Sequence, residues 1–122
     1  DALQRCKPDV VVGFSWGGAI AIELIRSGDW KGPTVLLAPA HKKLDQLMRR
    51  DPPLPALNRE HTVVVHSEAD TLIPLAHSTE LENVCKVRLV KVAGEPHKMW
   101  GIAKDGLLQR VVREVVSSSA SS

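Results

Sequence analysis

A serine between two glycines is the first feature of this sequence that could do chemistry, in the pattern Gly13-Phe14-Ser15-Trp16-Gly17. The apolar run 10–12 precedes it, and a stretch with helical periodicity follows it. On a tight turn from strand to helix, a serine takes a strained backbone conformation and its hydroxyl is exposed at the edge of the sheet. Glycines on both sides allow strand and helix to approach closely, and Gly18 adds to this packing. We therefore predict that Ser15 is a nucleophile and that the Trp16 N–H binds an oxyanion.

A nucleophilic serine requires a base, and the base requires an acid that orients it. Asp70 lies in the loop after a third apolar run, and His97 lies in the loop after a fourth. The three residues follow in the order Ser, Asp, His, each at the carboxyl end of a predicted strand, where ligands bind in open α/β sheets. This order predicts a catalytic triad of Ser15, Asp70 and His97. Glu68, two residues before Asp70, is an alternative acid.

Four apolar runs and four helical patterns alternate along the chain and would position these residues. The runs predict strands at 10–12, 34–38, 62–66 and 87–92, and the periodic segments predict helices at 16–27, 41–50, 74–84 and 102–116. Strict alternation favours an α/β fold with a parallel sheet of about four strands. The fourth run alternates between apolar and polar residues, as an edge strand does. We expect one domain over residues 1–116 and a disordered serine-rich tail over 117–122.

These residues together resemble the carboxyl-terminal half of the α/β-hydrolase fold, over about residues 10–116. Ser15 matches the nucleophile of that family. Asp70 matches its acid, in a segment similar to H-G-x-x-D-x-x-V-P, although Ser67 replaces the frequent glycine. His97 matches its base, in a loop similar to G-x-x-H. The resemblance implies a serine hydrolase without a cofactor, and it favours Asp70 over Glu68 as the acid.

The family also carries four strands before the nucleophile strand, and a second oxyanion donor among them. Here only nine residues, which begin with Asp1, precede the first predicted strand. We therefore expect a piece of a larger hydrolase in which the nucleophile strand is an open apolar edge and the helix at 102–116 is alone on its face. An exposed apolar edge favours association with other chains.

Two functions follow from these expectations. The first is hydrolysis of a small carboxylic ester or thioester through an acyl-enzyme. The alternative is a non-catalytic fragment or pseudo-hydrolase that acts through association, including self-association at the exposed sheet edge. His41 follows the second predicted strand at the same edge, where it could bind substrate. The alternative for His41 is a solvated histidine that opens a basic helix.

Composition excludes several other classes of protein. The 122 residues are 43% hydrophobic and 25% charged, which is typical of one globular domain. A net charge of +2 and only four aromatic side chains (three Trp and one Phe) do not favour a nucleic-acid partner. No apolar run is long enough to span a bilayer. Cys6 and Cys85 do not form a disulfide framework, so we expect reduced thiols and a cytoplasmic protein. The scattered histidines predict no metal site.

Overall fold

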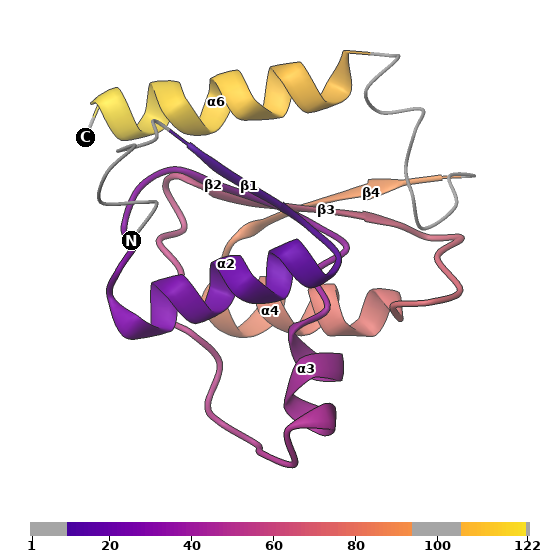
Figure 1. Cartoon of the computed structure of the whole chain (residues 1–122). Coiled ribbons are helices and arrows are strands. Elements are labelled where there is room, and N and C mark those ends of the chain that lie inside the picture. Colours follow the sequence, from indigo (N-terminus) through magenta and orange to yellow (C-terminus); the bar gives the residue numbers. More distant parts are fainter. Residues whose placement is uncertain (1–9, 94–105, 122) are drawn as a thin grey trace.

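Four parallel strands form one sheet in the computed structural model, which describes residues 10–93 and 106–121 (Figure 1). The strands are β1 (Val11–Phe14), β2 (Thr34–Leu37), β3 (Thr62–Ser67) and β4 (Arg88–Val92). Their order in the sheet follows the chain, β1-β2-β3-β4. Val35 of β2 pairs with Val12 on one side and Val63 on the other. This confirms the predicted parallel α/β sheet, and it brings all four carboxyl ends to one edge.

Helices cover both faces of the sheet, and two separate cores result. The helices α2 (Trp16–Ser27) and α4 (Leu75–Cys85) lie on one face, and α6 (Leu107–Ser121) lies on the other (Figure 1). Side chains of β2 alternate between the faces. Leu36 packs toward α2 and α4, in a core that includes Ile22 of α2 and Leu81 of α4. Val35 and Leu37 pack in the second core with Val111 and Val115 of α6.

Of the first three predicted helices, one has the observed bounds and two differ. The helix α2 has the predicted bounds and closes on Gly28 in the left-handed conformation, with φ at 81°. The helix α3 (His41–Leu47) is shorter than the predicted 41–50, because the chain turns at Arg49, whose φ is 52°. Pro74 precedes α4 as its cap, with an extended ψ of 135°, and is not its first helical residue.

The carboxyl-terminal helix corrects a prediction about the tail. The structure has α6 continuing to Ser121, so the segment 117–121, expected to be disordered, is helical. Serine costs only a few tenths of a kcal/mol in a helix interior, and a helix that is already nucleated adds residues cheaply. Residues 102–105, where this helix was expected to begin, lie outside the described residues.

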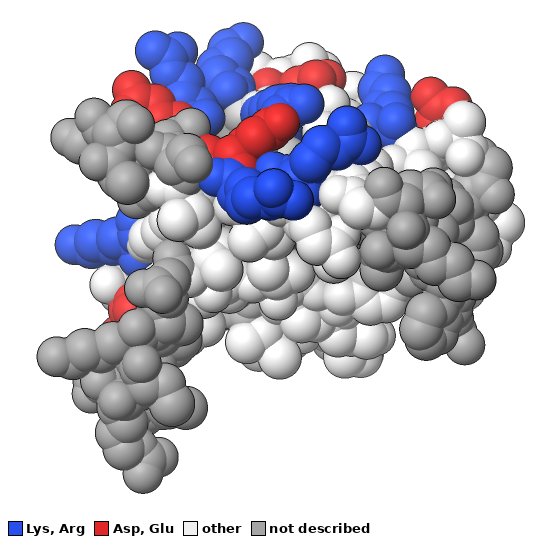
Figure 2. Space-filling view, turned by 90° about the horizontal axis from the view of Figure 1, so that it is seen from above, with Lys and Arg blue, Asp and Glu red and all other residues white. Residues whose placement is uncertain are grey.

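The two edges of the sheet differ in character. At β4, Arg88 is exposed and forms an ion pair with Glu114 of α6. β4 is the edge strand that the alternating run predicted. At β1, Val11 packs against the α2 core. Val12 and Phe14 therefore point to the α6 face, where they are 43% and 36% exposed. Figure 2 views this face, on which Lys and Arg gather to one side of a broad band without charged side chains.

The expected open edge is thus present in the part of the chain that the structure describes. There, β2 is the only strand that pairs with β1. Among the described helices, α6 alone covers its face of the sheet.

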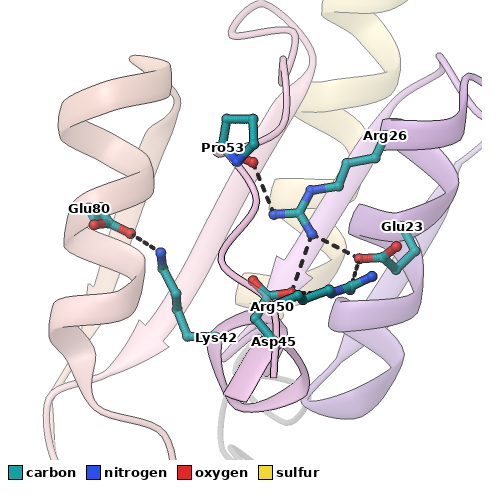
Figure 3. A network of polar contacts seen from close by, with 7 residues as sticks. All are labelled: Glu23, Arg26, Lys42, Asp45, Arg50, Pro53 and Glu80. Carbon is teal, nitrogen blue, oxygen red and sulfur yellow. Dashed lines mark hydrogen bonds and ion pairs between the residues drawn. The ribbon is translucent and has the colours of Figure 1, made fainter. Parts of the chain in front are cut away.

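A network of ion pairs fixes α3 beside α2 (Figure 3). Asp45 of α3, whose side chain is 7% exposed, accepts a hydrogen bond of 2.9 Å from Arg50 Nε and lies 3.6 Å from Arg26 Nη1. Glu23 of α2 binds both arginines. Arg26 also donates to the carbonyl of Pro53 at 3.3 Å. The network therefore joins α2, α3 and the loop after α3 that contains Pro53.

We expect Asp45→Asn to destabilise the fold by about 2 kcal/mol, because two arginines lose a buried anionic partner. Urea unfolding measures this change. The matched control is Glu80→Gln, which removes the more exposed ion pair of Lys42 with Glu80 and should cost less than about 0.5 kcal/mol. Equal losses in the two variants would contradict a special role for the Asp45 network.

Candidate functional site

The backbone of Ser15 is strained, with φ at 55° and ψ at −113°. This places a residue with a Cβ at positive φ, which costs about 1–3 kcal/mol and persists only when the surroundings enforce it. Three hydrogen bonds do so: Ser15 N donates to the Leu37 carbonyl at 2.8 Å, and its carbonyl accepts from Ala40 N at 2.9 Å and Ala19 N at 3.2 Å. The turn from strand to helix that the sequence predicted is therefore present, and the role of the Ser15 hydroxyl as a nucleophile stays a prediction.

Two of the three nearby glycines are sterically required by this turn. A Cβ on Gly13 would lie 2.6 Å from the carbonyl oxygen of Gly17, and one on Gly18 would lie 2.9 Å from Pro39 Cα. A Cβ on Gly17 would meet nothing within 4 Å. The predicted close approach of strand and helix thus depends on Gly13 and Gly18, whereas Gly17, the second glycine of the pentapeptide, faces open space.

Trp16 begins α2 directly after the strained turn. The N–H groups in the first turn of a helix have no acceptor within that helix, and they carry the positive end of its dipole. The Trp16 N–H therefore has the position that the oxyanion prediction requires, and its binding of an oxyanion stays a prediction. Trp16 as a whole residue is 50% exposed.

Asp70 lies in the turn after β3, at the same edge of the sheet as Ser15. Its side chain is fully buried. Its Oδ1 accepts hydrogen bonds of 2.8 Å from both Leu72 N and Ile73 N. The alternative acid, Glu68, is an exposed residue, and its N–H donates to the Val92 carbonyl at 2.9 Å. Of the two carboxylates, Asp70 is the one held in place by its own turn.

The predicted base, His97, lies outside the described residues. β4 ends at Val92, at the carboxyl edge that also carries Ser15 and Asp70. The arrangement of the described strands therefore brings two of the three predicted triad residues to one edge, and the third stays a prediction.

His66 is a residue beside this site that the sequence analysis did not single out. Its imidazole is fully buried, and Nε2 lies 3.4 Å from Asp70 Oδ2. The signal was a histidine at the end of the predicted strand 62–66, four residues before Asp70. Spacing alone did not indicate that both side chains turn inward.

His41 opens α3 as expected, but its side chain is buried and only 1% exposed. The alternative of a solvated histidine is therefore wrong. The ring of His77 in α4 lies 6.4 Å away, centroid to centroid, at an interplanar angle of 71°. Burial lowers the pKa of His41 from 6.5 to about 4. A role for His41 in binding substrate stays a prediction.

The described residues contain no group of three His, Cys, Asp or Glu side chains placed to hold a metal ion. Within the same ranges, no helix combines the length and the apolar character needed to cross a membrane.

Two alanine substitutions at adjacent glycines test the packing of the turn. Gly18→Ala should destabilise the fold by about 1–3 kcal/mol, because the new methyl group overlaps Pro39. Gly17→Ala is the matched control, and it should stabilise the fold by about 0.5 kcal/mol, because alanine favours the helix and finds open space. Thermal unfolding of both variants measures the difference. Similar melting temperatures for the two would show that the turn tolerates a side chain at either position.

Because His41 is buried, we expect the free energy of unfolding to fall in acid. The pKa of His41 is about 4 in the folded chain, against the ordinary 6.5 expected after unfolding. Between these values the unfolded chain binds more protons than the folded chain. The stability that depends on a neutral His41 is therefore fully present above pH 6.5 and is lost as the pH falls toward 4. The free energy of unfolding should fall by up to about 3 kcal/mol across this range. In His41→Gln, urea titrations at several pH values should give a shallower slope, and an unchanged slope would contradict this origin.

No family model and no curated protein matches this sequence. Solved structures do match. A candidate YdeN-like hydrolase from Pectobacterium atrosepticum is 20% identical with a TM-score of 0.73, and the match covers 97% of this chain and 65% of that one. A predicted CIB-like hydrolase from Thermoplasma acidophilum is 21% identical with a TM-score of 0.69, over 95% and 55% of the two chains.

A candidate hydrolase of the alpha/beta superfamily from Xanthomonas campestris is 23% identical with a TM-score of 0.65, and the match covers 93% of this chain and 58% of that one. These identities establish the fold alone. The chain spans between 55% and 65% of the length of these three solved proteins. With four parallel strands in the order β1-β2-β3-β4 and helices on both faces, this chain has the fold of the α/β hydrolases over little more than half of their length.

Proposed function

We propose that this chain carries the nucleophile and the acid of a serine hydrolase that cleaves carboxylic esters or thioesters. The observation that supports this most is the strained Ser15, which three backbone hydrogen bonds hold at the carboxyl edge of the sheet. Strain of this kind is expensive, and it concentrates at functional sites. A packing role for Ser15 would not need it.

The proposed reaction proceeds through an acyl-enzyme. His97 takes the proton of Ser15 Oγ as the oxygen attacks the substrate carbonyl, and Asp70 orients the imidazole and stabilises the imidazolium. The Trp16 N–H donates to the oxyanion of the tetrahedral intermediate. When this intermediate collapses, the bond to the leaving alcohol or thiol breaks and the imidazolium returns the proton to it. Water, deprotonated by His97, then attacks the acyl group and releases the carboxylic acid and free Ser15.

Exposed apolar residues close in sequence to Ser15 and Asp70 favour an apolar acyl group. Phe14 precedes Ser15, Trp16 follows it, and Leu72 lies two residues after Asp70; they are 36%, 50% and 60% exposed. A solved relative of the fold, a thermophilic esterase from Thermogutta terrifontis with propionate bound, is 17% identical with a TM-score of 0.56, over 85% of this chain and 52% of that one. A short apolar acyl chain is therefore the substrate group we propose.

Cys85 is a weaker candidate for a nucleophile. Burial raises the pKa of its thiol, which favours the unreactive protonated form. Its Sγ donates to the Pro55 carbonyl at 3.3 Å, at the end of α4 and away from the carboxyl edge of the sheet.

The open edge at β1 favours a second function, association without catalysis. Val12 and Phe14 are exposed there, and β2 is the only described strand that pairs with β1. Edge strands favour pairing with strands of other chains. Light scattering distinguishes the two functions in part, because a concentration-independent monomer would contradict self-association through this edge.

Reaction with a fluorophosphonate tests the proposed hydrolase directly. Intact mass should show one adduct on the wild-type chain and none on Ser15→Ala, because only an activated serine attacks this reagent. Asp70→Asn should react at least about 100-fold more slowly, since an amide cannot stabilise the imidazolium. Circular dichroism of each variant controls for folding. A folded wild-type chain that forms no adduct would contradict catalysis by this chain.

A further inference from the structure

The imidazole of His66 is fully buried near the carboxyl end of β3, and both of its nitrogens have partners. Its Nδ1 lies 2.6 Å from Ser78 Oγ in α4. Its Nε2 lies 2.8 Å from the carbonyl oxygen of Ile73, in the turn that follows β3, and 3.4 Å from Asp70 Oδ2. One ring therefore joins three elements: the strand, the turn that carries the predicted acid, and the helix after it.

The chemistry of these partners determines where the proton of the ring lies. The Ile73 carbonyl can only accept a hydrogen bond, and an ionised Asp70 carboxylate can also only accept. Nε2 faces both, so it must carry a hydrogen. Ser78 Oγ can donate, so an unprotonated Nδ1 completes a neutral ring with both nitrogens satisfied.

The contacts of this ring close a cycle around the predicted acid. Ile73 N donates to Asp70 Oδ1 at 2.8 Å, while the Ile73 carbonyl accepts from His66 Nε2. His66 in turn faces the second oxygen of Asp70. The peptide groups around residue 73 are thus held from both sides, and the Asp70 carboxylate cannot turn without breaking a bond in the cycle.

We infer that His66, as a neutral imidazole with its hydrogen on Nε2, is a positioning residue that orients the Asp70 carboxylate and holds its turn against β3 and α4. This inference rests on the proposed function in one respect, that Asp70 is the catalytic acid. His66 acts only through Asp70 and does not contact substrate. Because the acid fixes the orientation of the base, a small displacement of the Asp70 turn lowers the rate of acylation strongly.

Two amide substitutions separate the functions of the two ring nitrogens. The side-chain nitrogen of glutamine reaches the position of Nε2, whereas that of asparagine reaches only the position of Nδ1. His66→Gln therefore keeps the donor to Ile73 and Asp70, and it should react with a fluorophosphonate within about 3-fold of the wild-type rate. His66→Asn lacks this donor and should react roughly 10- to 100-fold more slowly. The matched control Ser78→Ala removes only the partner of Nδ1 and should stay within about 3-fold.

Two further measurements do not depend on activity. Long-range proton–nitrogen NMR of the full chain, labelled with ¹⁵N in histidine, should show His66 as the neutral form with its hydrogen on Nε2. Amide exchange at Leu72 and Ile73 should accelerate about 10-fold or more in His66→Asn and stay near the wild-type rate in His66→Gln, because both N–H groups bind Asp70 Oδ1.

The outcomes distinguish this inference from the proposed function. An Nδ1–H form of His66, or wild-type exchange at Leu72 and Ile73 in His66→Asn, would overturn the inference even if Ser15 reacts. A His66→Asn variant that is labelled at the wild-type rate would overturn it as well. A wild-type chain without labelling refutes the proposed function, and NMR and amide exchange still decide whether His66 holds the Asp70 turn.

Discussion

The positive φ of Ser15 is the constraint on which the other features of the carboxyl edge of the sheet depend. Its strain must be balanced by contacts on both sides, and the hydrogen bonds to Leu37, Ala40 and Ala19 come from β2, from the segment after it and from α2. The bond from Ala19 requires α2 to begin directly after the turn, and Gly13 and Gly18 permit the close approach of α2 to β1 and to Pro39. The strain, the glycines and the order of the strands are therefore parts of one arrangement.

The turn that carries Asp70 is also fixed by hydrogen bonds, but these bonds go to a side chain. At Ser15 the backbone is strained and backbone hydrogen bonds hold it, whereas at Asp70 a buried carboxylate organises its own turn through two N–H donors. A buried polar group is costly unless it is satisfied, so each bond that satisfies Asp70 also limits its motion. His66 extends this order into β3 and α4. Both turns are thereby attached to the two central strands, β2 and β3.

The fold, and the placement of Ser15 and Asp70 at one edge of the sheet, could be predicted from the sequence because their signals are local. The buried strands are continuous apolar runs, and the turn at Ser15 has a strand before it and a helix after it. Contacts between distant residues left no such signal. Gly17 and Gly18 are adjacent and identical in sequence, yet only Gly18 meets Pro39, because that contact depends on how β2 ends. The burial of His41 and His66 depends in the same way on helix α4, which packs beside them only in the folded chain.

The open edge of β1 links the two functions that the chain could serve. Among the described strands β1 pairs only with β2, so the strand that leads into Ser15 is an edge strand of the described sheet. Strained conformations persist only when their surroundings determine them fully, and an edge strand is the part of a sheet that moves most easily. A further strand paired with β1 would stiffen the segment that leads into the turn at Ser15. On the proposed function, pairing at this edge would therefore also stiffen the backbone that carries the predicted nucleophile.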